Sequence, residues 1–201
     1  MTQILIFGDS ITYGAFDKKG GWVERLKTAL MEKDILVYNL GVSGDTTIDL
    51  LDRFENETRA RYDNDTTLIL EIGINDSYHS DITPEMFENN IQELIKKAKK
   101  YSKKIVFLGL TPVDESKTNP LPWNKNAFYK NNKIQKYDNI IKEVCKRNSI
   151  HFIEISNNFA KTDYKILLHD GLHPNTKGHE KIFEIVSKDL NKLIGQDLFQ
   201  P

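Results

Sequence analysis

Five short apolar runs are the feature of this 201-residue chain that most constrains its fold. Each run is nearly continuous rather than alternating, which is typical of strands buried on both faces of a parallel sheet. Between the runs, apolar residues recur at helical spacing and predict amphipathic helices. The runs cover residues 4–7, 35–38, 68–72, 105–108 and 150–153. Strand and helix therefore alternate along the chain, which predicts one doubly wound α/β domain over residues 1–201.

Start signals support two of the expected helices. Thr83 is a good N-cap residue, and Pro84 then occupies the first helical position, where proline is favoured. Thr46 followed by Asp49 resembles a capping box, with aspartate in place of the usual glutamate. These signals predict helices that begin directly after Thr46 and Thr83.

Composition narrows the class of protein. The formal net charge is −1, so the chain lacks the basic surplus of a nucleic-acid-binding protein. Neither a secretory signal nor an apolar stretch long enough to span a bilayer is visible, which predicts no stable membrane insertion. The single cysteine, Cys145, excludes an intramolecular disulfide and fits a reducing compartment. We therefore expect a cytoplasmic protein whose partner is a small molecule.

Polar, glycine-rich clusters follow the predicted strands. They cover residues 8–10, 39–46, 73–77 and, before the last expected helix, 169–175. In an open α/β sheet, ligands bind beyond the carboxyl ends of the strands. We therefore expect all four clusters to lie together at one edge of the sheet.

Two of these clusters suggest acyl-transfer chemistry. Gly171 and Pro174 disfavour a helix, so a turn could place the Asp170 carboxylate on one nitrogen of His173. The other nitrogen would then face Ser10 as a general base. Two alternatives stay open on the residues alone. One is a metal site formed by His169, Asp170 and His173, and the other is a flavin or nucleotide module whose first loop cradles phosphate.

A serine nucleophile also needs hydrogen-bond donors for the oxyanion that forms when it attacks a carbonyl. The backbone N–H of Ser10, the backbone N–H of Gly44 and the side-chain amide of Asn75 are the candidates. Asp9 neighbours the serine, but we expect it to accept a backbone hydrogen bond near the turn rather than act as the base. Glu71 lies late in a buried run, and we expect it to have a structural role with a polar partner.

Together these blocks resemble the GDSL family, in its SGNH hydrolase branch. The run Gly8-Asp9-Ser10-Ile11-Thr12 is similar to the first block of the family, although isoleucine follows the serine where the family has leucine. The other characteristic residues occur in the expected order, as Gly44, Asn75 and His173, the last within Asp170-Gly171-Leu172-His173-Pro174. The resemblance extends over essentially the whole chain.

The resemblance implies a flavodoxin-like, three-layer α/β/α fold with a central five-stranded parallel sheet. It also implies a Ser10–His173–Asp170 triad and an oxyanion hole formed by the Ser10 N–H, the Gly44 N–H and the Asn75 amide. The implied activity is that of an esterase without a metal or a cofactor. Activities of the family include hydrolysis of carboxylic esters and thioesters, among them acyl-CoA, lysophospholipids and acetylated sugars.

The substrate is expected to depend on the long segment from residue 111 to 132, which breaks the rhythm of strands and helices. Long loops in compact domains are often functional. We predict a substrate pocket that includes Trp123, Phe128 and Tyr129 from this segment, together with Asp9. An ester of a small or medium acyl group is favoured, with a thioester, a lysophospholipid or an acetylated carbohydrate as alternatives. Residues 195–201 are expected to form a loose tail or to pack on a neighbour.

Overall fold

The computed structural model describes residues 2–194, and the expected tail at 195–201 lies outside this range. Five parallel strands form one sheet in the order β2-β1-β3-β4-β5. Their bounds are β1 Thr2–Gly8, β2 Ile35–Gly41, β3 Thr66–Glu71, β4 Lys104–Leu108 and β5 His151–Ile153. Each strand coincides with one of the five apolar runs, so the predicted five-stranded parallel sheet is confirmed.

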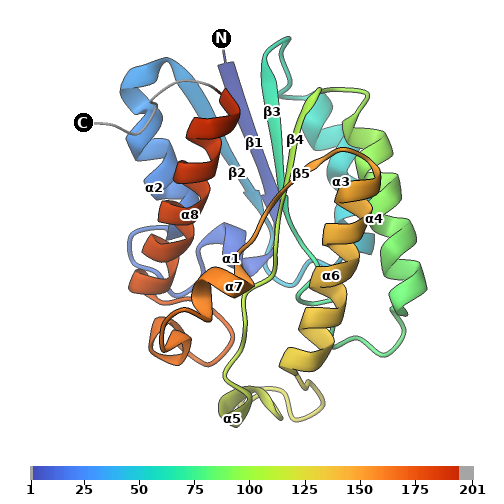
Figure 1. Ribbon diagram of the computed structural model, residues 1–201, viewed down its shortest axis with the longest axis vertical. Coiled ribbons are helices and arrows are strands. Elements are labelled where there is room, and N and C mark those ends of the chain that lie inside the picture. Colours follow the sequence, from blue (N-terminus) through green and yellow to red (C-terminus); the bar gives the residue numbers. More distant parts are fainter. Residues whose placement is uncertain (1, 195–201) are drawn as a thin grey trace.

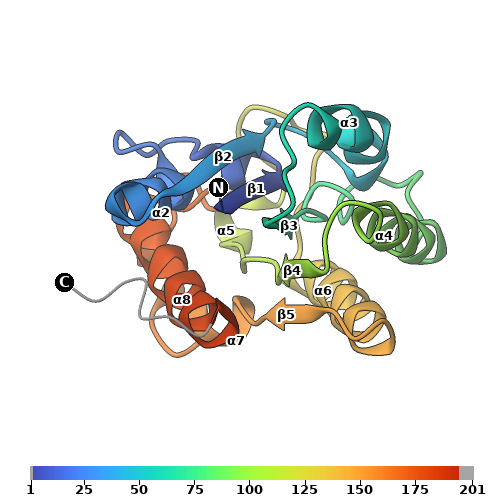
Figure 2. The same cartoon turned by 90° about the horizontal axis from the view of Figure 1, so that it is seen from above.

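Helices cover both faces of the sheet, which confirms the three-layer α/β/α architecture (Figure 2). One layer contains α2 Gly21–Leu30 and α8 Thr176–Ile194, which pack against each other. The other contains α3 Thr47–Arg59, α4 Pro84–Ala98 and α6 Asn131–Arg147, with α4 in contact with both neighbours. Shorter elements connect these layers. They are α1 Ser10–Tyr13, η1 Met31–Lys33, α5 Glu115–Thr118, α7 Ser156–Phe159 and η2 Tyr164–Leu167.

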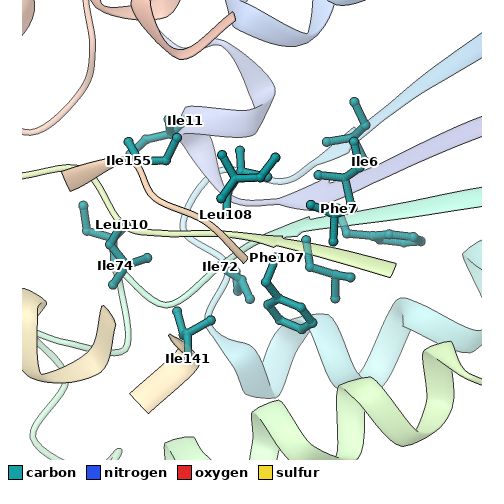
Figure 3. Packing of buried hydrophobic residues seen from close by; sticks show 14 of the residues in the cluster. Ile6, Phe7, Ile11, Ile72, Ile74, Phe107, Leu108, Leu110, Ile141 and Ile155 are labelled. Atoms are coloured by element: carbon teal, nitrogen blue, oxygen red, sulfur yellow. The ribbon is translucent and has the colours of Figure 1, made fainter. Parts of the chain in front are cut away.

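The apolar runs are continuous because β1, β3 and β4 lie between two helical layers. Ile6 and Phe7 are successive strand residues that point to opposite faces of the sheet, and both are completely buried. Phe7 packs against Phe54 of α3, with ring centroids 4.8 Å apart. Figure 3 shows the same packing around Ile72, Phe107 and their neighbours. Burial on both faces removes the need for polar residues at alternate positions.

Both predicted helix starts are confirmed. Thr46 and Asp49 form a reciprocal capping box at the start of α3. The Thr83 side chain accepts a hydrogen bond from the Met86 N–H, and Pro84 occupies the first position of α4. The short helix α5 was not predicted within the segment from 111 to 132. A single helical turn carries no periodic apolar pattern, so such an element leaves little trace in a sequence.

The carboxyl ends of the strands lie at the lower edge of the sheet in Figure 1, near α1 and α5. The segments that follow β1, β2 and β3 and the segment that precedes α8 meet at this edge, where their residues line one cleft. None of the helices within residues 2–194 combines the length and the apolarity needed to cross a membrane.

Candidate active site

The turn after β1 presents Ser10 at the start of a helical turn. A side chain at Gly8 would overlap Thr12 and the backbone of Glu71, so the end of the strand requires glycine. Asp9 is the N-cap of α1, and its Oδ1 accepts a hydrogen bond from the Ile11 N–H at 2.9 Å. This backbone contact is the one expected for Asp9. The turn leaves Ser10 8% exposed at the base of a cleft.

The segment before α8 forms a tight turn around the Asp170 carboxylate. Its Oδ1 accepts hydrogen bonds from the backbone N–H groups of Leu172 and His173, at 2.9 and 2.8 Å. The backbone N–H of His169 donates to the His173 carbonyl at 2.8 Å and closes the turn. The second carboxylate oxygen of Asp170 is therefore left to face the imidazole ring.

Ser10, His173 and Asp170 are joined by hydrogen bonds in series. The distance from His173 Nε2 to Ser10 Oγ is 2.9 Å, and that from His173 Nδ1 to Asp170 Oδ2 is 2.7 Å. A carboxylate accepts only, so Nδ1 carries a proton in this network and Nε2 is free to accept from the serine. The order of contacts matches that of a nucleophile, a base and an orienting group.

The electrostatics of Asp170 favour this arrangement. Partial burial raises the pKa of its carboxyl group, but the hydrogen bonds from the His173 ring, the His173 backbone and the Leu172 backbone outweigh that effect. The pKa of Asp170 is consequently lower than its ordinary value. An ionised Asp170 holds the ring of His173 in one orientation and stabilises its protonated form.

The same contacts bear on the alternative of a metal site. Both ring nitrogens of His173 are engaged, one by Asp170 and one by Ser10. The His169 side chain takes no part in these contacts and stacks on Phe16 instead, with ring centroids 4.8 Å apart. Within residues 2–194, no group of three or more acidic, histidine or cysteine side chains has an arrangement that could hold a metal ion.

The three candidate oxyanion donors border the same cleft as Ser10. Gly44 has φ of +91°, a left-handed conformation that favours glycine, although a Cβ there would meet no atom within 4 Å. The left-handed backbone conformation, and not a lack of space for a side chain, therefore explains why glycine occupies position 44. Among the described residues, no atom accepts a hydrogen bond from the N–H of Ser10 or of Gly44. The Asn75 amide donates to the Asp45 carbonyl at 2.9 Å.

Arg53 links the loop of Gly44 to β1 and was not identified from the sequence. Its Nε donates to Asp45 Oδ2 at 2.7 Å, and its terminal nitrogen donates to the Gly8 carbonyl at 3.2 Å. Arg53 belongs to α3, eight residues after Asp45, so the helix supplies the clamp for the loop that precedes it. An arginine on a predicted helix gives no local signal of this contact.

The cleft above Ser10 has a volume of about 360 Å³. Trp123 and Tyr129 line it, whereas Asp9 and Phe128, the other two residues predicted for the pocket, do not. Asp9 is completely buried beneath the turn because its carboxylate caps α1. Phe128 is 41% exposed outside the cleft, whereas the next residue, Tyr129, is buried. The lining residues are Ser10, Ala15, Phe16, Ser43, Gly44, Asn75, Tyr78, Leu121, Trp123, Asn124, Ala127, Tyr129, Leu172 and His173.

Two exposed aromatic rings flank His173 at the mouth of the cleft. The ring of Phe16 lies 5.0 Å from the imidazole, and that of Trp123 lies 6.4 Å from it. Both side chains are more than half exposed. Phe16 also has φ of +62°, a left-handed conformation that is unusual for a bulky residue. No sequence signal indicated Phe16, because backbone conformation in a loop is not visible in the residue type.

Two carboxyl groups lie buried under the turn that presents Ser10. Burial raises the pKa of Asp9 to about 7, against the lowering effect of its hydrogen bond from Ile11. Burial, and then the charge of Asp9, raise the pKa of Glu71 well above its ordinary value. The Thr12 hydroxyl donates to Glu71 Oε2 at 2.6 Å and is the polar partner expected for that residue. Neither carboxyl group lines the cleft.

A second hollow, of about 440 Å³, lies at the opposite edge of the sheet, between residues 64–66 and 99–104. Its charged side chains are surface lysines and Asp65, which pairs with Lys104. It contains no serine–histidine pair, and the only serine that lines it, Ser102, donates to backbone carbonyls. The smaller cleft at Ser10 is therefore the candidate active site.

Comparison with known proteins agrees with this geometry. Residues 6–181 match the model of the GDSL-like lipase/acylhydrolase family. An acetylxylan esterase from Geobacillus stearothermophilus is 25% identical over 204 residues, which cover 88% of each chain.

Solved structures show the same fold. A lipase/acylhydrolase from Enterococcus faecalis superposes with a TM-score of 0.81 at 22% identity, over 96% of each chain. An acetylxylan esterase from Geobacillus stearothermophilus superposes with a TM-score of 0.77 at 22% identity, over 99% of this chain and 96% of that one. The family match covers most of the chain, including the turn of Ser10 and the turn of His173. The chain therefore belongs to the GDSL-like lipase/acylhydrolase family and is an ester-hydrolysing enzyme.

Proposed function

We propose that the protein is a serine esterase that cleaves esters of small or medium acyl groups through an acyl-serine intermediate. The observation that carries this proposal is the series of hydrogen bonds from Ser10 through His173 to Asp170, at the base of an open cleft. Membership of an enzyme family argues against the alternative of a non-enzymatic flavin or nucleotide module.

In the first half of the reaction, Ser10 Oγ attacks the ester carbonyl carbon while its proton passes to His173 Nε2. The negative charge that develops on the carbonyl oxygen is stabilised by the N–H groups of Ser10 and Gly44 and by the Asn75 amide. His173 then gives the proton to the oxygen of the leaving alcohol, and the original carbon–oxygen bond breaks. Asp170 stabilises the protonated imidazole throughout this exchange.

In the second half, water replaces the alcohol. His173 Nε2 accepts a proton from the water as its oxygen attacks the acyl carbon, and the same three donors stabilise the new oxyanion. Return of the proton to Ser10 Oγ breaks the acyl–serine bond and releases the carboxylic acid. Every proton transfer uses His173, so the reaction needs neither a metal nor a cofactor.

The shape of the cleft favours a compact substrate. Its volume of about 360 Å³ lies near the lower end of the range for small-molecule pockets, roughly 300–1,000 Å³. The walls near Ser10 combine short side chains, such as Ala15 and Ala127, with the ring of Tyr129. We expect a short acyl group to bind against them, with the alcohol part directed towards the exposed rings.

An acetylated carbohydrate is the second candidate substrate. The exposed rings of Phe16 and Trp123 beside His173 offer flat apolar faces, and sugar rings stack on such faces through their C–H groups. The acetylxylan esterase relative supports the same class of substrate. In this proposal, the acetyl group faces Ser10 and the sugar lies against Trp123.

Replacement of Ser10 tests the mechanism. Ser10→Ala is expected to lower kcat on p-nitrophenyl acetate by about 10⁴-fold or more, because no other group forms the acyl intermediate. A serine-directed organophosphonate should label the wild-type protein at Ser10, as measured by mass spectrometry of the peptides. Thermal unfolding serves as the control, since the variant should keep the wild-type fold. Near-normal hydrolysis by Ser10→Ala would contradict the proposal.

The substrate class is tested with a panel of esters. p-Nitrophenyl esters of increasing chain length should show the highest kcat/KM for short or medium acyl groups. Acetylated sugars, acyl-CoA and a lysophospholipid are assayed beside them as representatives of the other classes. A strict preference for long acyl chains would contradict the proposed substrate.

A further inference from the structure

The aromatic loop reaches the oxyanion site through one buried hydroxyl group. Tyr129 lies at the end of the loop, 3% exposed, and its hydroxyl donates to Asn75 Oδ1 at 2.7 Å. The backbone of Tyr129 is held on both sides by Thr118, whose carbonyl accepts from the Tyr129 N–H and whose hydroxyl donates to the Tyr129 carbonyl. The phenol is therefore presented to Asn75 by a fixed backbone.

The two ends of the Asn75 amide have different partners. Its Oδ1 accepts from Tyr129, and its Nδ2 donates to the Asp45 carbonyl at 2.9 Å. A flipped amide would place oxygen against the Asp45 carbonyl, so two acceptors would face each other. The two contacts consequently select one orientation, in which the second Nδ2–H remains available to the cleft.

The Tyr129 phenol is suited to donate at every working pH. Its burial raises the pKa of the hydroxyl above its ordinary value, with a further contribution from nearby Tyr78. The group therefore keeps its proton. Donation to the carbonyl oxygen of an amide also draws electron density from the amide nitrogen, which makes its N–H groups stronger donors.

From these contacts we propose that Tyr129 is a positioning residue that fixes and polarises the Asn75 amide as an oxyanion donor. This inference rests on the proposed serine esterase function. It gives the long loop a part in the chemical step as well as in the shape of the pocket. A preorganised donor stabilises the transition state more than the bound substrate, so loss of its orientation should affect kcat rather than KM.

A purely structural role for Tyr129 makes a different prediction. The ring also packs against Tyr78, with centroids 4.7 Å apart, and lines the cleft. If only this packing mattered, removal of the hydroxyl would change stability or KM and would act independently of Asn75. The two roles are therefore separated by the dependence of the Tyr129 effect on the Asn75 side chain.

The test is a double-mutant cycle on p-nitrophenyl acetate. Asn75→Ala is expected to lower kcat by about 10²–10³-fold, and Tyr129→Phe by about tenfold with KM changed less than about twofold. In the Asn75→Ala background, Tyr129→Phe should lower kcat by less than about twofold further, because the amide that it orients is gone. 3-Fluorotyrosine at position 129 keeps the hydroxyl and should keep kcat within about twofold of wild type.

Tyr137→Phe is the matched control. Tyr137 is 5% exposed, and its hydroxyl donates to the Ile82 carbonyl at 2.7 Å, away from the cleft. The substitution removes an equally short buried hydrogen bond and should lower the melting temperature while kcat stays unchanged.

The positioning role would be overturned by an equal loss of kcat from Tyr129→Phe in both backgrounds, by a loss confined to KM, or by a similar fall of kcat in Tyr137→Phe. Wild-type kcat in Tyr129→Phe, with Ser10→Ala inactive, would overturn this role alone. Hydrolysis by Ser10→Ala at the wild-type rate would instead overturn the serine esterase mechanism.

Discussion

Two segments at the carboxyl edge of the sheet contribute residues to the cleft, and they differ in hydrogen bonding and in exposure. The segment from 168 to 175 is a short turn in which the Asp170 carboxylate accepts two backbone N–H groups and the His173 ring. The segment from 119 to 130 has a backbone hydrogen bond from Leu121 to Ala127 and exposes Trp123 and Phe128. The groups proposed to move protons are held by a dense network, whereas Trp123, which is proposed to contact the substrate, lies on an open loop.

This difference has a physical reason. Proton transfer requires distances near 3 Å, and a misplacement of about 1 Å can cost roughly 10²-fold in rate. Contact with an alcohol group requires a surface of suitable chemistry, which an exposed ring provides without many constraints. Tyr129 combines features of both segments. It belongs to the open loop, but it is buried and its hydroxyl donates a hydrogen bond to Asn75.

Among the changes that test this difference between the two segments, replacement of the Asp170 carboxylate should have the largest effect. Asp170→Asn is expected to lower kcat by about 10³-fold, because an amide neither stabilises the protonated imidazole nor selects its tautomer. The loss should be smaller than the roughly 10⁴-fold found for a fully buried aspartate, since the Asp170 side chain is 13% exposed. Steady-state kinetics on p-nitrophenyl acetate measure it.

Asp163→Asn is the control for this substitution, because Asp163 is exposed and lies outside the cleft. It should keep wild-type kinetics. A wild-type kcat in Asp170→Asn would show that the network around His173 does not depend on the carboxylate.

The buried acids beneath the turn of Ser10 should make stability depend on pH. The folded protein holds the Asp9 proton up to a pKa of about 7, whereas an unfolded aspartate ionises near pH 4. Between these values the unfolded chain binds fewer protons, so the free energy of unfolding falls as pH rises. Asp9→Asn removes this dependence and should reduce the loss of stability between pH 5 and pH 7.5 by about 2–3 kcal/mol.

Urea unfolding at the two pH values measures this effect. The pKa of Asp170 is lowered in the folded state, so that group is ionised throughout this window and does not contribute to the slope. Glu71→Gln should change the slope in the same direction, because the pKa of Glu71 is also raised. An unchanged slope in both variants would contradict the assignment of the two buried acids.

The aromatic loop should give the smallest effect, and one that depends on the substrate. Trp123→Ala is expected to lower kcat/KM by about tenfold for an acetylated sugar, through loss of one stacking face, and by less than about threefold for p-nitrophenyl acetate. Phe128→Ala is the matched control, since this exposed ring of the same loop does not line the cleft. Equal losses on both substrates would place Trp123 in the chemical step instead.

Much of the molecule was predicted from local patterns. The five apolar runs became the five strands, and the start signals at Thr46 and Thr83 became the caps of α3 and α4. The polar clusters after the strands were expected at one edge, and their residues line one cleft there. Asp9 and Phe128, both predicted as pocket residues, do not line that cleft, because the direction of a loop side chain does not follow from its position in the sequence.

Periodicity and capping act over a few residues, so the amino-acid sequence alone was sufficient to define the strands, most helices and the α/β class. The cleft depends on contacts between distant residues, such as Ser10 with His173, Asn75 with Tyr129 and Gly8 with Arg53. Only the folded chain decides these contacts, because packing of the two helical layers determines which loops meet and how their side chains turn. The acyl-transfer residues could be proposed from their chemistry, whereas the positioning role of Tyr129 became visible only in three dimensions.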